Sequence, residues 1–278
     1  MPVTGPTTWR WFEPGILSAD TITKLPDDTT GAVVVSGSHG GLYPGYLAVK
    51  AGVRAVILND AGIGRNEAGV GSLLYLQALG IAAATVAHMS CLIGDACDML
   101  VRGQISRANA QATAVGVIQG EACAGAAGRL VKAPRHVVEP PYIGENRNEL
   151  WLPGARRRVL LLDSASLVRP DDAGEIIVTG SHGGLIGGDP ALALRTDGLA
   201  AVFNDAGRSD GPGTSRLPAL DRRGIAAVTV AARSASIGDA VSTFRDGIIS
   251  AANDAASRRG ARPGDPVRIC VSEWASMR

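Results

Sequence analysis

Residues 32–42 read AVVVSGSHGGL and residues 175–185 read EIIVTGSHGGL, so one apolar run with one polar ending occurs twice in the chain. The likeness continues in the same order through two further pairs of segments. These pairs are RAVILNDAG (54–62) with LAAVFNDAG (199–207), and GIAAATVAHMSCLIGDA (80–96) with GIAAVTVAARSASIGDA (224–240). The sequence therefore indicates a tandem duplication.

We place the first copy at residues 13–133 and the second at residues 157–278. Residues 134–156, between them, are polar and contain four prolines, and proline interrupts regular helices. We therefore expect a proline-rich linker. The sequence leaves open whether the copies share one sheet or form two domains.

Each copy alternates short β-branched runs with longer segments whose apolar residues have helical spacing. This pattern predicts an α/β fold with a βαβαβα unit in each copy. The runs are almost continuously apolar, as in mainly parallel sheets with helices on both faces. Right-handed crossovers follow from that arrangement.

The composition excludes several classes of function. The 278 residues carry a formal net charge of +1 and only 4% aromatic residues, without runs of Lys or Arg. Nucleic acid is therefore an unexpected partner. The N-terminus lacks a basic stretch followed by an apolar run, and no segment reaches about 18 apolar residues. We expect a cytoplasmic protein, without a membrane partner, that can form a homo-oligomer.

The four cysteines show neither CxxC spacing nor a paired framework. We expect reduced thiols, no zinc site and no cofactor. Nucleotide-binding and common hydrolase motifs such as GxxxxGK[ST] and GxSxG are absent from the sequence. A metal held by His39 and Asp60 with further carboxylates would have an incomplete ligand set.

Two polar motifs, Ser-His-Gly-Gly and Asn-Asp-Ala-Gly, each follow a predicted strand in both copies. Ligands of parallel sheets bind at the carboxyl ends of strands. A histidine exchanges protons near neutral pH, and an aspartate can fix its tautomer. We therefore predict catalytic pairs of His39 with Asp60 and of His182 with Asp205. The alternative is that these residues only hydrogen-bond the ends of tight turns.

Other residues at the same edges are candidates for substrate binding. The glycine pairs can expose N–H groups as an anion or oxyanion nest, and arginine suits carboxylates, although a loop ion pair explains it equally well. The candidates are Ser38, Gly40, Gly41, Asn59, Arg65, Ser90, Ser181, Gly183, Gly184, Asn204, Arg208 and Ser234. Asp95 and Asp239 are interpreted as helix N-caps, because each precedes a long helical segment.

The two copies differ where His88 and Met89 are replaced by Ala232 and Arg233. The carboxyl edges of the two predicted sheets therefore differ in chemistry. One copy can hold the working site while the other copy supports it. Cys91 lies beside Ser90, but its counterpart is Ala235, and a lone cysteine is commonly a small buried hydrophobe.

The order of motifs resembles that of caspase-like peptidases over about a third of each copy. In this order, a strand ends in His-Gly, a helix follows, and the next strand ends in a turn of small residues. His39 and His182 match that family's histidine. The resemblance implies a related sheet topology. Where the family has its nucleophilic cysteine, this sequence has Asp60-Ala61 and Asp205-Ala206, so peptidase activity is not implied.

These observations predict an enzyme acting on a small polar or carboxylate-bearing molecule. The main expectation is a hydrolase of an amide-like or cyclic substrate, in which histidine activates water and the glycine pairs stabilise an oxyanion. Isomerase or lyase chemistry is an alternative. A protein that only binds a small anion, or a structural subunit of an oligomer, also remains open.

Overall fold

The computed structural model describes residues 8–277, which divide into two compact units. Unit 1 contains the described residues up to Asp60, residues 70–143 and residues 186–188. Unit 2 contains residues 61–69, 144–185 and 189–277. The expectation about the N-terminus concerns residues that lie partly outside this description, since residues 1–7 are not included.

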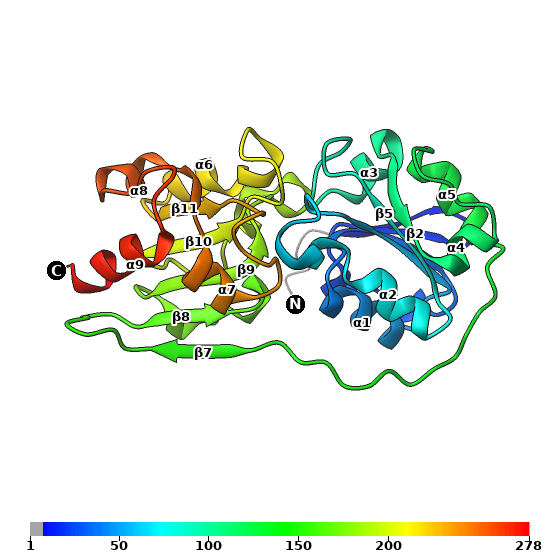
Figure 1. The fold of residues 1–278 in the computed structure, drawn as a ribbon, viewed down its shortest axis with the longest axis horizontal. Helices are drawn as coiled ribbons and strands as arrows, with labels where there is room; N and C mark the ends of the chain where they lie inside the picture. Colours follow the sequence, from blue (N-terminus) through cyan, green and yellow to red (C-terminus); the bar gives the residue numbers. More distant parts are fainter. Residues whose placement is uncertain (1–7, 278) are drawn as a thin grey trace, which may run out of the picture. The chain divides into compact units, whose positions relative to one another are not determined.

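Unit 1 is built on a six-stranded sheet in the order β1-β2-β3-β4-β5-β6 (Figure 1). Strands β2 to β5 are parallel, and β1 and β6 pair antiparallel at the two edges. The strands are β1 Trp9–Glu13, β2 Ile16–Ala19, β3 Val33–His39, β4 Ala55–Asn59, β5 Ala82–Val86 and β6 Ile105–Ala108. The α-helices are α1 Leu42–Lys50, α2 Ser72–Ala78, α3 Ala96–Arg102, α4 Ala110–Ala114 and α5 Cys123–Leu130. The 3-10 helices η1 Ile22–Lys24 and η2 Asp27–Thr29 precede β3. In the sequence, η3 Arg65–Val70 follows β4, but its residues 65–69 belong to unit 2.

Unit 2 repeats this pattern in the order β12-β11-β10-β9-β8-β7, again with antiparallel edge strands. The strands are β7 Arg147–Leu150, β8 Val159–Leu162, β9 Ile176–His182, β10 Ala200–Asn204, β11 Ala226–Val230 and β12 Ile249–Ala252. The α-helices are α6 Arg216–Asp221, α7 Ala240–Asp246, α8 Asp254–Arg258 and α9 Val267–Ser276. The 3-10 helices in this part of the sequence are η4 Ala165–Leu167, η5 Pro170–Asp172, η6 Ile186–Gly188, η7 Pro190–Leu192 and η8 Pro212–Thr214, of which η6 belongs to unit 1.

Helices cover both faces of each sheet, because successive strand residues point to opposite faces and both sets are apolar. In unit 1, Val33 and Val35 pack with Met99 of α3 and Leu130 of α5. Helices α1 and α2 contact β3 and β5 and pack against each other. In unit 2, α7 and α9 share one core with Val178, and α6 shares the other with Phe203.

The predicted α/β fold with two matching, mainly parallel sheets is confirmed. The antiparallel edge strands β1, β6, β7 and β12 were not predicted, and the residues of β6 stood in a segment with helical spacing. Strand β7 lies within residues 134–156, the segment expected to be only a linker. It reads RNEL and is largely exposed, so it has no apolar alternation that sequence analysis could detect. No described helix is long and apolar enough to cross a membrane.

The copies also differ around α1, whose place after β9 is taken in the described chain by the short turns η6 and η7. The buried Arg216 holds this irregular segment. Its Nε donates to the Gly184 carbonyl at 3.0 Å, and its Nη1 donates to the carbonyls of Leu192 and Ala193. The equivalent residue in unit 1 is Ser72. The backbone N–H of Ser72 donates to the Gly40 carbonyl, just as the backbone N–H of Arg216 donates to the Gly183 carbonyl. The side chain of Arg216 thus stabilises a segment of unit 2 that has no helix equivalent to α1.

Candidate functional site

Three neighbouring strands of unit 1 bring histidines and an aspartate to one edge of the sheet. His39 ends β3, Asp60 directly follows β4, and His88 follows β5 by two residues. Residue Asn59 of β4 is in register with His39 on one side and with Val86 of β5 on the other. Asp60 is therefore flanked by a histidine-bearing strand end on each side.

Asp60 pairs with His88. Its Oδ1 accepts a hydrogen bond from the ring Nδ1 at 2.8 Å and from the backbone N–H of His88 at 2.9 Å. The carboxylate is 3% exposed and the imidazole is 24% exposed. Because Nδ1 donates to the carboxylate, Nε2 of the neutral ring has the lone pair that can accept a proton.

The structure does not join His39 to Asp60 by a hydrogen bond, because among the described residues the hydrogen-bond partner of the His39 ring is Gly41. The backbone N–H of Gly41 donates to His39 Nδ1 at 3.1 Å. This bond places the proton of the neutral ring on Nε2. Burial lowers the pKa of His39 to about 4, so the ring is neutral at pH 7.

The predicted pairing of His182 with Asp205 is not found either. Asp205 Oδ1 accepts the backbone N–H groups of Gly207 and Ala232, each at 2.9 Å. Its hydrogen bonds in the described chain are to backbone only. Each aspartate therefore binds the backbone of the loop that follows the neighbouring strand, which is β5 in unit 1 and β11 in unit 2. Only in unit 1 does the aspartate also bind an imidazole.

Three of the four N–H groups that were predicted to form oxyanion nests bind protein atoms. The N–H of Gly40 donates to the Asn59 carbonyl at 2.7 Å, and the N–H of Gly183 donates to the Asn204 carbonyl at the same distance. The N–H of Gly41 is committed to His39. Gly184 contributes its carbonyl, which accepts from Arg216. These donors hold adjacent loops together instead of facing a ligand.

The candidate serines have matching structural partners in the two copies. Ser38 Oγ accepts the N–H of Ile22 at 3.0 Å, and Ser181 Oγ accepts the N–H of Ala165 at 2.9 Å. Ser90 and Ser234 each donate to the carbonyl three residues earlier at 2.7 Å and accept a backbone N–H at 3.0 Å. Their hydroxyls close loops, and nothing in these contacts assigns them to a substrate.

The candidate amides and arginines also contact protein atoms. Asn59 Nδ2 donates to Cys91 Sγ at 3.3 Å, and Asn204 Nδ2 donates to the Ala235 carbonyl at 3.2 Å. In unit 2, Arg65 donates to the Ser234 carbonyl at 3.1 Å. The guanidinium of Arg208 binds Asp210, which agrees with the alternative of a loop ion pair.

The interpretation of Asp95 and Asp239 as N-caps is confirmed. Asp95 Oδ1 accepts the N–H of Asp98 at 2.9 Å, and Asp239 Oδ1 accepts the N–H of Ser242 at 2.8 Å. The thiol of Cys91 is buried, and this burial raises its pKa to about 12. A buried thiol with a raised pKa favours the protonated form, which agrees with the interpretation of Cys91 as a small buried hydrophobe.

Sequence analysis missed the function of two aspartates that follow β2 and β8. Asp20 Oδ1 accepts the N–H of Ala96 at 3.0 Å, and Asp163 Oδ1 accepts the N–H of Ala240 at 3.1 Å. Each bond anchors the first turn of α3 or α7. Burial raises the pKa of Asp20. The signal was present, because both aspartates end the apolar run that opens their copy.

In unit 2, a strained segment covers the position that corresponds to His88. Ala232 has the carbonyl that accepts the N–H of Arg65 at 2.9 Å. A Cβ on Gly64 would lie 3.1 Å from the same oxygen. Ile63 has φ +61°, which is unfavourable for a β-branched residue. Residues 64 and 65 therefore pack against Ala232, whereas the side chain of His88 is partly exposed to solvent.

The low pKa of His39 predicts an acid-sensitive stability. Between pH 6.5 and 4 the unfolded chain binds a proton at His39 that the folded chain does not, so the unfolding free energy falls as pH falls. The full shift corresponds to roughly 3 kcal/mol. His39→Asn keeps an acceptor for Gly41 and removes the titration.

Urea unfolding at pH 7 and pH 4.5 measures this effect. We expect the wild type to lose roughly 2 kcal/mol more than His39→Asn over this interval. His136→Asn, at an exposed histidine, is the control and should behave as the wild type. Equal losses in all three proteins would contradict the assignment.

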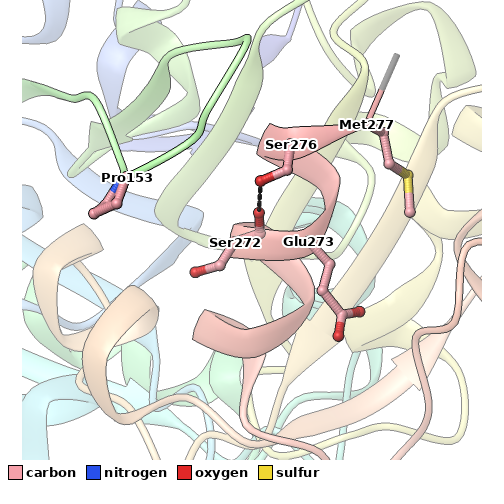
Figure 2. A pocket seen from close by; sticks show the side chains of 5 residues that line it. All are labelled: Pro153, Ser272, Glu273, Ser276 and Met277. Carbon is pink, nitrogen blue, oxygen red and sulfur yellow. Dashed lines mark hydrogen bonds between the residues drawn. The ribbon is translucent and has the colours of Figure 1, made fainter.

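Within the described chain, no group of three or more His, Cys, Asp or Glu side chains is arranged to hold a metal ion. A shallow depression of about 480 Å³ lies in unit 2 on the exposed side of α9. Figure 2 shows its lining residues, Pro153, Ser272, Glu273, Ser276 and Met277. None of them belongs to the candidate residues, and the Ser276 hydroxyl is bound to the Ser272 carbonyl at 3.0 Å.

Comparison with known proteins adds no identification. The chain matches no protein-family model, no curated protein and no solved structure. The chemistry of the Asp60–His88 pair is therefore the basis for assigning a function.

Proposed function

We propose that this protein is an enzyme that hydrolyses a small amide- or ester-like molecule, with His88 as general base and Asp60 as its orienting partner. The observation that supports the proposal is the 2.8 Å hydrogen bond between a buried carboxylate and a partly exposed imidazole at the carboxyl edge of a parallel sheet. Ligands of open α/β sheets bind at this edge.

The orientation of the ring suits proton transfer. The carboxylate holds Nδ1–H and stabilises the imidazolium that forms when Nε2 takes a proton from water. The N–H of Met89, the next residue, donates to no acceptor in the described part of the chain. It replaces the Gly-Gly pair as the backbone donor that we assign to a developing oxyanion.

We assign the catalytic role to unit 1 and a supporting role to unit 2. The matched aspartate of unit 2 has the same contacts with the loop but no imidazole, and Gly64 packs on the residue that replaces it. The proposed setting is the cytoplasm, and the proposed partner is a small molecule.

Hydrolysis of 4-nitrophenyl acetate at pH 7.5 tests the proposal. We expect His88→Gln to lower the rate at least about tenfold, because general-base catalysis typically contributes 10²–10⁴-fold. His136→Gln is the matched control, since His136 is an exposed histidine that forms no ion pair in the described chain. A wild-type rate no higher than that of His88→Gln would overturn the proposal.

A further inference from the structure

The loop that follows His88 exposes two large apolar side chains. Met89 follows His88 directly and is 61% exposed, and Leu92, three residues further, is 36% exposed. The backbone N–H of Leu92 is held by Asp98 Oδ2 at 2.6 Å, which fixes this loop at the start of α3. Both side chains are therefore open to solvent within four residues of the proposed base.

The charges near this loop are unfavourable for an anion. Burial is the main cause of the raised pKa of the Cys91 thiol, and the carboxylates of Asp98 and Asp60 raise it further while Arg102 lowers it, so all three charges act on the same loop. Arg102 is not available for a substrate, because its Nε and Nη2 bind Asp98 Oδ1 at 2.7 and 2.6 Å. Two carboxylates against one paired guanidinium give this loop a net negative charge.

The arginines that suggested a carboxylate-bearing substrate are engaged elsewhere. Arg65 binds the Ser234 carbonyl within unit 2, and Arg208 binds Asp210. The second copy carries Arg233 where the first carries Met89. The copy that has the dyad thus has an apolar residue at the position where the other copy has a cation.

We infer that the substrate of this dyad is a neutral ester or amide whose apolar acyl group contacts Met89 and Leu92, and that carboxylate-bearing substrates are disfavoured. This inference rests on the proposed function. In the reaction, His88 Nε2 takes a proton from water while the water oxygen bonds to the carbonyl carbon. The bond to the leaving group then breaks with its electron pair, and the proton passes from His88 to the leaving group or solvent.

Two 4-nitrophenyl esters of equal chain length separate the alternatives. The pentanoate ends in a methyl group, and the glutarate monoester ends in a carboxylate. We expect the part of kcat/KM that depends on His88 to be at least about tenfold higher for pentanoate than for glutarate, and to rise from acetate to pentanoate. His88→Gln provides the background rate for each ester.

Met89 is tested by substitution with its counterpart. Met89→Arg should remove or reverse the preference for pentanoate by introducing the cation of the second copy, and Met89→Leu, the matched control, should keep it. A His88-dependent rate that is equal for the two esters or higher for glutarate would overturn the inference and leave the proposed function standing. Rates that do not depend on His88 would overturn both.

Discussion

Replacing Asp60 with asparagine should lower His88-dependent ester hydrolysis by about 10²-fold or more, whereas Asp205→Asn should leave the rate within about twofold. The amide Oδ1 of asparagine can still accept the backbone N–H at position 88 or 232, which both aspartates bind at 2.9 Å. Only at position 60 does the amide also meet an imidazole. The amide carries no charge, so the imidazolium that forms during proton transfer loses its counter-charge even where Oδ1 keeps the Nδ1–H bond.

The comparison separates catalysis from folding, because the two substitutions affect the loop contacts alike. Urea unfolding at pH 7 checks that both variants are folded. Equal His88-dependent activity in Asp60→Asn and the wild type would show that Asp60 acts only on the backbone.

Gly37→Ala and Gly180→Ala should each destabilise the fold by about 3 kcal/mol or more. A Cβ on Gly37 would lie 2.7 Å from the Asp20 carbonyl oxygen and from the Asp95 nitrogen. On Gly180 it would lie 2.5 Å from the Asp239 nitrogen and 2.7 Å from the Asp163 carbonyl oxygen. Backbone surrounds both positions, so the clash cannot be relieved by rotating a side chain.

Gly128→Ala is the matched control for these glycines. Gly128 lies inside α5, and a Cβ there would meet nothing within 4 Å. Alanine should stabilise this helix by about 0.5–1 kcal/mol, because it loses less conformational entropy on folding. Urea unfolding at pH 7 measures all three variants. A loss below about 1 kcal/mol for Gly37→Ala would show that the β2 and α3 loops yield easily.

Together these predictions separate two functions of the repeated motif. The glycine before Ser-His allows the strand end to approach the first turn of a helix in both copies, and the aspartate of Asn-Asp-Ala-Gly binds the next loop in both. These are requirements of the fold. The imidazole at position 88 is present in one copy only, and our functional assignment depends on it.

The sequence by itself determined the duplication and the α/β class with mainly parallel sheets, because these follow from local periodicity and from matching segments. It also determined the caps at Asp95 and Asp239, since an N-cap acts on the N–H groups of its own helix. It could not reveal β7, because three of the four residues of this strand are polar and the strand is formed by pairing with β8.

Only the tertiary structure decided which histidine Asp60 contacts. Strand β4 lies between β3 and β5, so the sequence offered histidines on both neighbouring strand ends. The backbone N–H of Asp60 binds the Val86 carbonyl of β5 at 2.9 Å, and the N–H of Gly41 holds the His39 ring. These are bonds between segments distant in sequence, and their directions depend on backbone geometry that residue identity alone does not specify. They place the carboxylate beside His88.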